Sequence, residues 1–158
     1  MNLAIWDIES SSASTDFGSI IEIGGVLVDE NFKEKDRFNL RCRLPEGEIF
    51  QAMALIVNKT SIKKLTQANL SHYQMLAEVE KIFKKWSPAI FLGWSNIGFD
   101  DEMIRKEFFK GIRYPYLTNA APNKRHDGIN IARAAYAVDP NILEVEFNEK
   151  NNAVFKLE

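Results

Sequence analysis

Two carboxylates stand close together near the N-terminus, in the stretch AIWDIESSS of residues 4–12. The apolar residues before them predict a buried strand, and side chains alternate along a strand, so Asp7 and Glu9 fall on one face of it. Two neighbouring carboxylates repel each other unless a cation lies between them or water surrounds them. The alternatives are a solvated strand end and a cation site, and the buried run before Asp7 favours the cation site.

A third carboxylate follows another apolar run. Residues 89–94, AIFLGW, predict a second buried strand, and Asp100 comes shortly after its end. If this strand lies beside the first, Asp100 comes close to Asp7 and Glu9. Converging carboxylates raise one another's pKa, and hard divalent cations with oxygen ligands remove that cost. Two Mg²⁺ ions roughly 4 Å apart activate a water and stabilise the leaving oxygen of a phosphodiester, so these acids indicate phosphoryl hydrolysis.

The elements that must position these acids follow an α/β pattern. Residues 3–8, 18–32 and 37–44 predict a three-stranded antiparallel meander, because Ile and Val alternate between turn-forming segments. The run at 89–94 adds one strand parallel to the first. Helical spacing of apolar residues and the candidate N-cap Ser71 predict a helix over 71–86. Further helices are expected at residues 60–65, 99–110 and 128–138, and residues 143–158 alternate like a hairpin.

Composition limits the class of protein. With 158 residues, 46% of them hydrophobic and 11% aromatic, the chain is long enough for one domain over residues 1–158. A net charge of -2 gives no overall basic signal, so a nucleic-acid contact would be local. Cys42 is the single cysteine, and the N-terminus lacks a signal-peptide pattern, so we expect a cytoplasmic location. The longest apolar runs are far shorter than the ~20 residues that cross a bilayer.

Three segments together resemble the DEDD superfamily of 3′→5′ exonucleases: DIE on the first strand, IIEIGGVLVD on the second, and NIGFDDEMIRKEFF. Within it, SNIGFDDEMIRKEFFKGIRYPY and HDGINIARAAYAVDP are most similar to the bacterial exonuclease I branch, of the DEDDh type. The resemblance implies an α/β, RNase H-like mixed sheet, an antiparallel meander plus a parallel strand, flanked by helices. It also implies hydrolysis of phosphodiesters at the 3′ ends of single-stranded DNA with two Mg²⁺ or Mn²⁺ ions.

The resemblance also assigns roles to residues, position by position. The first motif supplies two acids and the second motif one, and all three would bind metal and take part in catalysis. A Thr that contacts the terminal nucleotide in the family is a Ser here, and the second motif has an Asn and a Phe before its acid. The implied metal-binding and catalytic residues are Asp7, Glu9 and Asp100, and the implied substrate-binding residues are Ser10, Asn96 and Phe99.

One departure from the family matters most. Its third motif, His-x-x-x-x-Asp or Tyr-x-x-x-Asp, supplies the general base and a fourth carboxylate, and neither pattern occurs here. His72 and His126 have no acid five residues later, and Tyr136 precedes Asp139 by three residues rather than four. The ending VFKLE resembles the family's approach to that motif, so we expect an N-terminal fragment with a C-terminally incomplete fold, although a final Leu-Glu also fits a cloning remnant. A missing general base costs roughly 10²- to 10⁴-fold in rate, so we expect impaired activity.

Two alternatives to a DNA exonuclease remain open at this point. The same chemistry would serve an RNA 3′-end exonuclease, because nothing in the sequence reads the 2′-hydroxyl. A non-catalytic domain of the same fold that binds nucleic acid or a partner protein would also lack the third motif. Three further expectations are structural. Glu22 has a partner or faces solvent, and His72 and His126 lie at the surface. The charged residues 124–127, KRHD, form a solvated loop, with a phosphate contact by Lys124 and Arg125 as the less favoured alternative.

Overall fold

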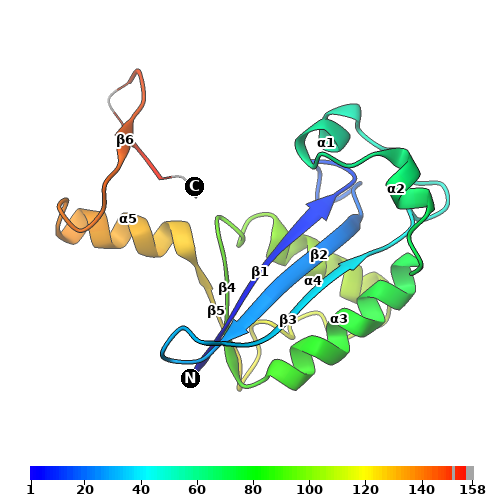
Figure 1. Ribbon diagram of the computed structural model, residues 1–158, viewed down its shortest axis with the longest axis horizontal. Coiled ribbons are helices and arrows are strands. Elements are labelled where there is room, and N and C mark those ends of the chain that lie inside the picture. Colours follow the sequence, from blue (N-terminus) through cyan, green and yellow to red (C-terminus); the bar gives the residue numbers. More distant parts are fainter. Residues whose placement is uncertain (151, 156–158) are drawn as a thin grey trace.

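A five-stranded sheet in the order β3-β2-β1-β4-β5 forms the body of the computed structural model, which describes residues 1–150 and 152–155 (Figure 1). The strands are β1 (Asn2–Ser10), β2 (Ile20–Val28), β3 (Glu34–Arg41), β4 (Ala89–Gly93) and β5 (Lys124–Asp127). β1, β2 and β3 pair antiparallel, whereas β4 pairs parallel to β1 and β5 parallel to β4. The predicted meander and the parallel strand beside it are confirmed.

The helices are α1 (Ala52–Val57), α2 (Ile62–Thr66), α3 (His72–Trp86), α4 (Asp100–Lys110) and α5 (Gly128–Val138). A capping box starts α3: the Ser71 hydroxyl accepts from the Gln74 backbone N–H, and the Gln74 side chain accepts from the Ser71 N–H. The sequence did not predict α1, whose N-cap Gln51 makes no side-chain capping bond. Within the described residues, none of these helices is both long enough and apolar enough to span a membrane.

One face of the sheet is covered by α3 and α4 (Figure 1). Ala4, Trp6 and Ile8 alternate along β1 toward this face and are buried. Phe83 of α3 lies at the centre of an aromatic cluster, with its ring centroid 5.6 Å from that of Trp6 and 4.9 Å from that of Phe91. Burial of these side chains removes large apolar areas from water, so this face supplies most of the stabilisation.

The opposite face of the sheet is accessible. Ile5 is 42% exposed, Asp7 is exposed and Glu9 is half-buried, because these residues alternate with the buried ones along β1. The predicted alternation of β1 is therefore confirmed, and the two N-terminal carboxylates lie on the side that a ligand can reach.

The interpretation of residues 124–127 as a solvated loop is wrong. They form β5, which pairs with β4 in the register Ile90↔Lys124 to Gly93↔Asp127. Hydrogen bonds to β4 stabilise this short polar strand, and such pairing leaves no hydrophobic pattern in the sequence. The side chain of Asp127 then caps α5 by accepting from the Ile129 N–H at 3.1 Å.

A second, two-stranded sheet follows α5. β6 (Glu146–Phe147) pairs antiparallel with β7 (Ala153–Val154), which confirms a hairpin in this part of the chain. Residues 151 and 156–158 of the expected hairpin lie outside the described residues. In Figure 1, α5 leads from β5 away from the sheet toward this hairpin.

Replacing Phe83 by Ala should lower the free energy of unfolding by about 3–5 kcal/mol, because it removes a fully buried ring from the aromatic cluster. Urea unfolding followed by tryptophan fluorescence measures the change. Phe109→Ala is the matched control, since Phe109 is 72% exposed on the neighbouring helix and its truncation should cost little. Equal losses for the two variants would contradict this description of the core.

Candidate active site

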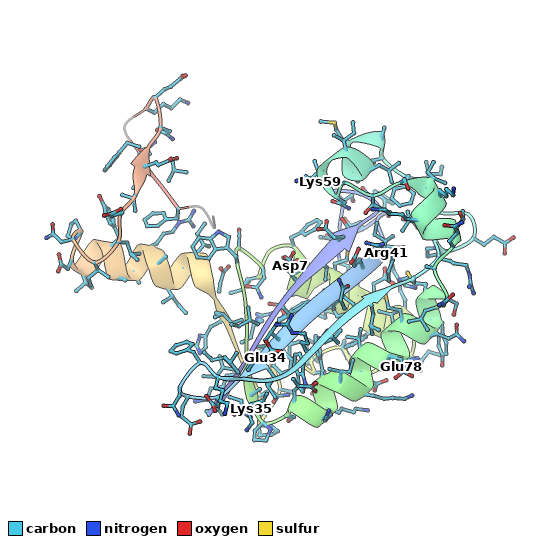
Figure 2. The ribbon with its side chains drawn as sticks, in the orientation of Figure 1. Asp7, Glu34, Lys35, Arg41, Lys59 and Glu78 are labelled. Atoms are coloured by element: carbon cyan, nitrogen blue, oxygen red, sulfur yellow. The ribbon has the colours of Figure 1, made fainter. Side chains whose placement is uncertain are left out.

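The first two carboxylates are placed by the register of β1 against β2. Asp7 pairs with Gly24 and Glu9 with Glu22 across the antiparallel ladder. A glycine opposite Asp7 places no side chain over its carboxylate, so this group stays exposed on the accessible face. Figure 2 shows Asp7 on β1 and Arg41 on β3.

The third carboxylate approaches from the other side of β1. Parallel pairing of β4 with β1 brings the chain after β4 to the same end of the sheet, where α4 begins at Asp100. Asp100 is only 6% exposed, and the backbone N–H of Ile8 on β1 partly lowers the pKa of its carboxyl group. Burial, and then the negative charge of Asp7, raise the pKa of Asp100 to about 7. The structure therefore brings Asp100 next to the Asp7–Ile8 segment.

The three carboxylates share an environment that disfavours their charged forms. Burial raises the pKa of Asp7, and burial followed by the charges of Asp7 and Glu22 raises the pKa of Glu9. Their oxygen atoms are the donors that Mg²⁺ and Mn²⁺ prefer, so their chemistry fits such ions. Yet no three acidic, His or Cys side chains in residues 1–150 and 152–155 stand close enough together to hold a metal ion. Metal binding by these residues stays a prediction.

Two cavities flank Glu9, and we name them by their position. The loop-side cavity, of about 300 Å³, is lined by Glu9, Ser10 and Phe99 together with residues of α1. The sheet-side cavity, of about 330 Å³, is lined by Asp7 and Glu9 together with residues of β2 and β3. Ser10 and Phe99 are thus placed where a ligand next to Glu9 would meet them, although the Ser10 hydroxyl donates to the Ser12 carbonyl at 2.7 Å.

Asn96 points to a different neighbour. It is 1% exposed, and its Nδ2 donates to Asp101 Oδ2 at 3.0 Å. Asp101 also accepts from Thr118 Oγ1 at 3.2 Å and lies 3.6 Å from the guanidinium of Arg125. Asn96 is therefore tied into the start of α4 beside Asp100, and a direct contact between Asn96 and substrate stays a prediction.

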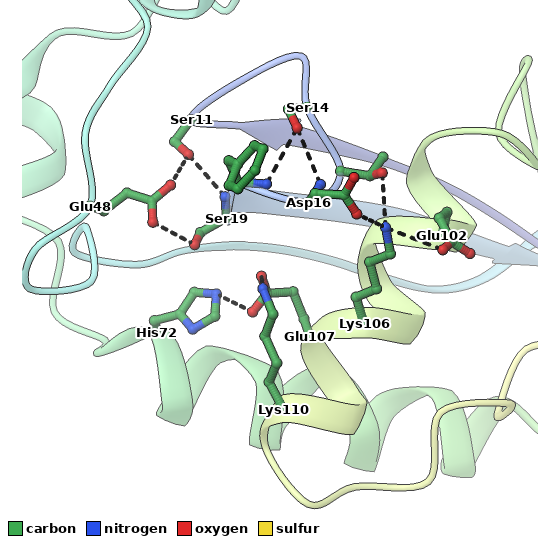
Figure 3. A network of polar contacts seen from close by, with 12 residues as sticks. Ser11, Ser14, Asp16, Ser19, Glu48, His72, Glu102, Lys106, Glu107 and Lys110 are labelled. Carbon is green, nitrogen blue, oxygen red and sulfur yellow. Dashed lines mark hydrogen bonds and ion pairs between the residues drawn. The ribbon is translucent and has the colours of Figure 1, made fainter.

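A polar network holds the loop after β1 in place (Figure 3). Glu48 accepts hydrogen bonds from the hydroxyls of Ser11 and Ser19 at the two ends of this loop. Lys106 of α4 donates to Thr15 Oγ1 at 3.1 Å and to Asp16 Oδ1 at 2.5 Å. The loop that borders the loop-side cavity is thereby tied to the helix that carries Asp100.

The sequence suggested that His72 lies at the surface, but the structure buries most of its side chain. Its side chain is 17% exposed, and its Nε2 lies 3.2 Å from Glu107 Oε2 (Figure 3). Burial lowers the pKa of His72 and raises the pKa of Glu107, so both groups shift toward neutrality. The capping box at Ser71 brings His72 to the start of α3, where the helix packs against α4 rather than facing solvent.

Sequence reasoning missed two residues beside the carboxylates. Asn58 lines both cavities, and its Nδ2 donates to the Ser10 carbonyl at 2.8 Å. Arg41 lines the sheet-side cavity and forms an ion pair with Glu22, which gives Glu22 the partner that the sequence left open. Strand alternation could have found Arg41, but only together with the register of β3 on β2, which the sequence does not state.

A meander of three antiparallel strands followed by parallel strands, with acids on the first strand and at the start of a helix after the fourth, is an RNase H-like arrangement. Solved structures confirm this fold: Escherichia coli exonuclease I in complex with a dA16 oligonucleotide has a TM-score of 0.90 and 20% identity over 98% of this chain. A product-bound exonuclease I structure has a TM-score of 0.89 and 19% identity over the same share.

Curated sequences agree with the structures, and the expected resemblance to exonuclease I is confirmed. Exodeoxyribonuclease I of Buchnera aphidicola subsp. Schizaphis graminum is 23% identical over 159 residues, which covers 99% of this chain. The Haemophilus influenzae protein of the same name is 23% identical over 156 residues. The chain spans about a third of the length of both relatives, 33% in each case. No family model matches the sequence.

Asp100→Asn should stabilise the metal-free protein, because a neutral isostere avoids burying a charge beside Asp7. The pKa of Asp100 rises from an ordinary 3.8 to about 7 on folding, so ionisation of Asp100 destabilises the folded wild type. This loss in free energy of unfolding is absent below about pH 4, grows as the pH rises and is complete above about pH 7. In EDTA, the variant's gain in free energy of unfolding should follow this rise and reach at least about 1 kcal/mol.

Urea unfolding of wild type and Asp100→Asn between pH 4 and 8 measures this difference. The matched control is Asp139→Asn, at the C-terminal end of α5 and away from the acids. A gain that does not change with pH, or that shrinks as the pH rises, would show that Asp100 is not forced to ionise in an unfavourable environment.

Proposed function

We propose that this chain is the nuclease domain of a metal-dependent 3′→5′ exonuclease that removes nucleotides from the 3′ ends of single-stranded DNA. The observation that carries the proposal is that Asp100, at the start of α4, lies close enough to Asp7 on β1 for the charge of Asp7 to raise its pKa, although the two acids are far apart in sequence. Similarity to exodeoxyribonuclease I over nearly the whole chain supports the same reaction.

In this proposal Asp7, Glu9 and Asp100 hold Mg²⁺ or Mn²⁺, with two ions in the complete enzyme. The ions would supply an activated water and charge stabilisation at the leaving oxygen. The protein's own contribution is to fix the three carboxylates, because two of them lie on β1 and the third on the first turn of α4. Binding a cation would also offset the effect of burial, which raises the pKa values of all three acids, and the repulsion that adds to it at Glu9 and Asp100.

The loop-side cavity is the proposed place for the 3′-terminal nucleotide. Phe99 offers an aromatic ring, Met53 and Val57 offer apolar surface, and Ser10 lies beside Glu9. Stacking of a base on an aromatic ring contributes about 1–3 kcal/mol without selecting a sequence. This fits an enzyme that must accept each base in turn.

The missing third motif limits the expected rate. No described residue replaces the positioned His as general base: His72 is paired with Glu107, and His126 lies exposed on β5. Loss of such a group costs roughly 10²- to 10⁴-fold. We therefore propose that this chain binds metal weakly and hydrolyses DNA slowly.

Asp7→Asn should abolish the slow, Mg²⁺-dependent release of nucleotides, because it removes a ligand that no neighbour replaces. Denaturing gels of single-stranded DNA labelled at the 5′ end show shortening from the 3′ end. Glu30→Gln, in the exposed turn between β2 and β3, is the control that should retain the wild-type rate. An unchanged rate in Asp7→Asn would refute the site, and an unimpaired rate that depends on Asp7 would refute only the impairment.

DNA should be the better substrate. The curated relatives are named exodeoxyribonucleases, and the E. coli structures contain dA16 and dT13 oligonucleotides. Matched deoxy- and ribo-oligonucleotides of one sequence, incubated with the chain and Mg²⁺, test this preference. Faster shortening of the ribo-oligonucleotide would favour the RNA 3′-end alternative, and shortening of neither would favour the non-catalytic binding domain.

A further inference from the structure

A row of three charged side chains crosses the accessible face of the sheet beside the carboxylates. Glu9 of β1 pairs with Glu22 of β2 in the ladder, and Glu22 pairs with Arg41 of β3. Like charges placed directly opposite each other destabilise a sheet, and an opposite charge on the third strand offsets this. Arg41 is therefore the cation that accompanies this end of the acid cluster.

Only part of the Arg41 guanidinium is used by its partner. Nε donates to Glu22 Oε2 at 2.8 Å, and Nη2 donates to the same oxygen. A guanidinium carries five N–H donors in a planar fork, and Nη1 of Arg41 has no acceptor in the described part of the chain. The Arg41 side chain is 35% exposed and that of Glu22 is 17% exposed, so the outer edge of the fork can reach solvent.

The Nη1 edge of the Arg41 guanidinium lies beside the carboxylates of the candidate site. Arg41 and Asn39 line the sheet-side cavity together with Asp7 and Glu9. Figure 2 labels Asp7 on β1 and Arg41 on β3. Among the described residues that line the two cavities beside Glu9, Arg41 is the one Lys or Arg. A DNA strand whose 3′ end lies at the acids brings phosphates past this edge, and a planar fork matches the geometry of phosphate oxygens.

We propose that Arg41 binds a backbone phosphate of the single strand in the sheet-side cavity, and that Glu22 is a positioning residue that orients its guanidinium. The inference rests on the proposed function. A surface ion pair without any role in binding is the competing explanation, and the two differ in their dependence on salt, since a phosphate contact releases a counterion from DNA.

The experiment measures binding of a fluorescein-labelled oligo-dT with a phosphorothioate 3′ linkage, by anisotropy in Mg²⁺ over a range of salt concentrations. Arg41→Gln should weaken binding about tenfold at low salt and reduce the slope of log K against log salt by about 0.7. Arg41→Lys keeps the charge and should restore the slope. The matched control is Arg37→Gln on the same face of β3, where Arg37 pairs with Glu34 and lines neither cavity.

Each outcome decides between the explanations. Equal affinities and slopes for Arg41→Gln and Arg37→Gln would overturn the role of Arg41 while leaving the proposed function intact. Failure of the wild-type chain to bind the oligonucleotide at any salt concentration would overturn both. If Arg41→Gln does not fold, ¹⁵N NMR of the wild-type chain replaces it: the Nε signal of Arg41 should shift on addition of oligo-dT and that of Arg37 should not, and an unmoved Arg41 signal would overturn the inference.

Discussion

The central position of β1 is the constraint on which the rest of the structure depends. β1 pairs antiparallel with β2 and parallel with β4, so its register is fixed from both sides. A shift by one residue would turn Trp6 toward solvent and Asp7 into the aromatic core. The same pairing that buries Trp6 against Phe83 therefore presents Asp7 and Glu9 on the accessible face.

Repulsion between carboxylates, and their burial, destabilise the folded chain at the C-terminal end of β1. Asp100 is buried beside Asp7, and Glu9 lies opposite Glu22, so four carboxylates share a small region. Arg41 offsets one of them, and backbone N–H groups, that of Ile8 among them, lower the pKa of Asp100 in part. A folded chain tolerates such an arrangement because the core on the other face supplies the stabilisation. Perturbed pKa values of this kind are typical of functional sites.

The main features of the fold could be predicted from the sequence because they leave periodic patterns. The alternation in β1, the apolar run of β4 and the capping residue of α3 all appear in the structure. β5 could not be predicted, because its residues are polar and only pairing with β4 makes them a strand. Helix α1 could not be predicted either, because its N-cap Gln51 makes no side-chain capping bond and none of its residues is buried.

The residues of the candidate site that belong to sequence motifs could be predicted. Those that reach the site only through the register of paired strands could not. Asp7 and Asp100 could be expected to meet, since parallel strands bring their following residues to one edge of a sheet. Arg41 and Asn58 both line the sheet-side cavity through strand and loop geometry that has no counterpart in the spacing of the sequence. Asn96 fits the family motif, yet its amide nitrogen bonds to Asp101, a contact that a motif cannot reveal.

The attachment of α5 has a consequence for local unfolding. None of its residues is buried, and its N-terminal end is held by Asp127, whose Oδ1 accepts from both Ser95 N and Ile129 N. An isolated helix of this length is marginal in water, because few hydrogen bonds offset the cost of starting it. Amide protons of α5 should therefore exchange with solvent through small local openings, while those of β1 exchange only when the whole sheet unfolds.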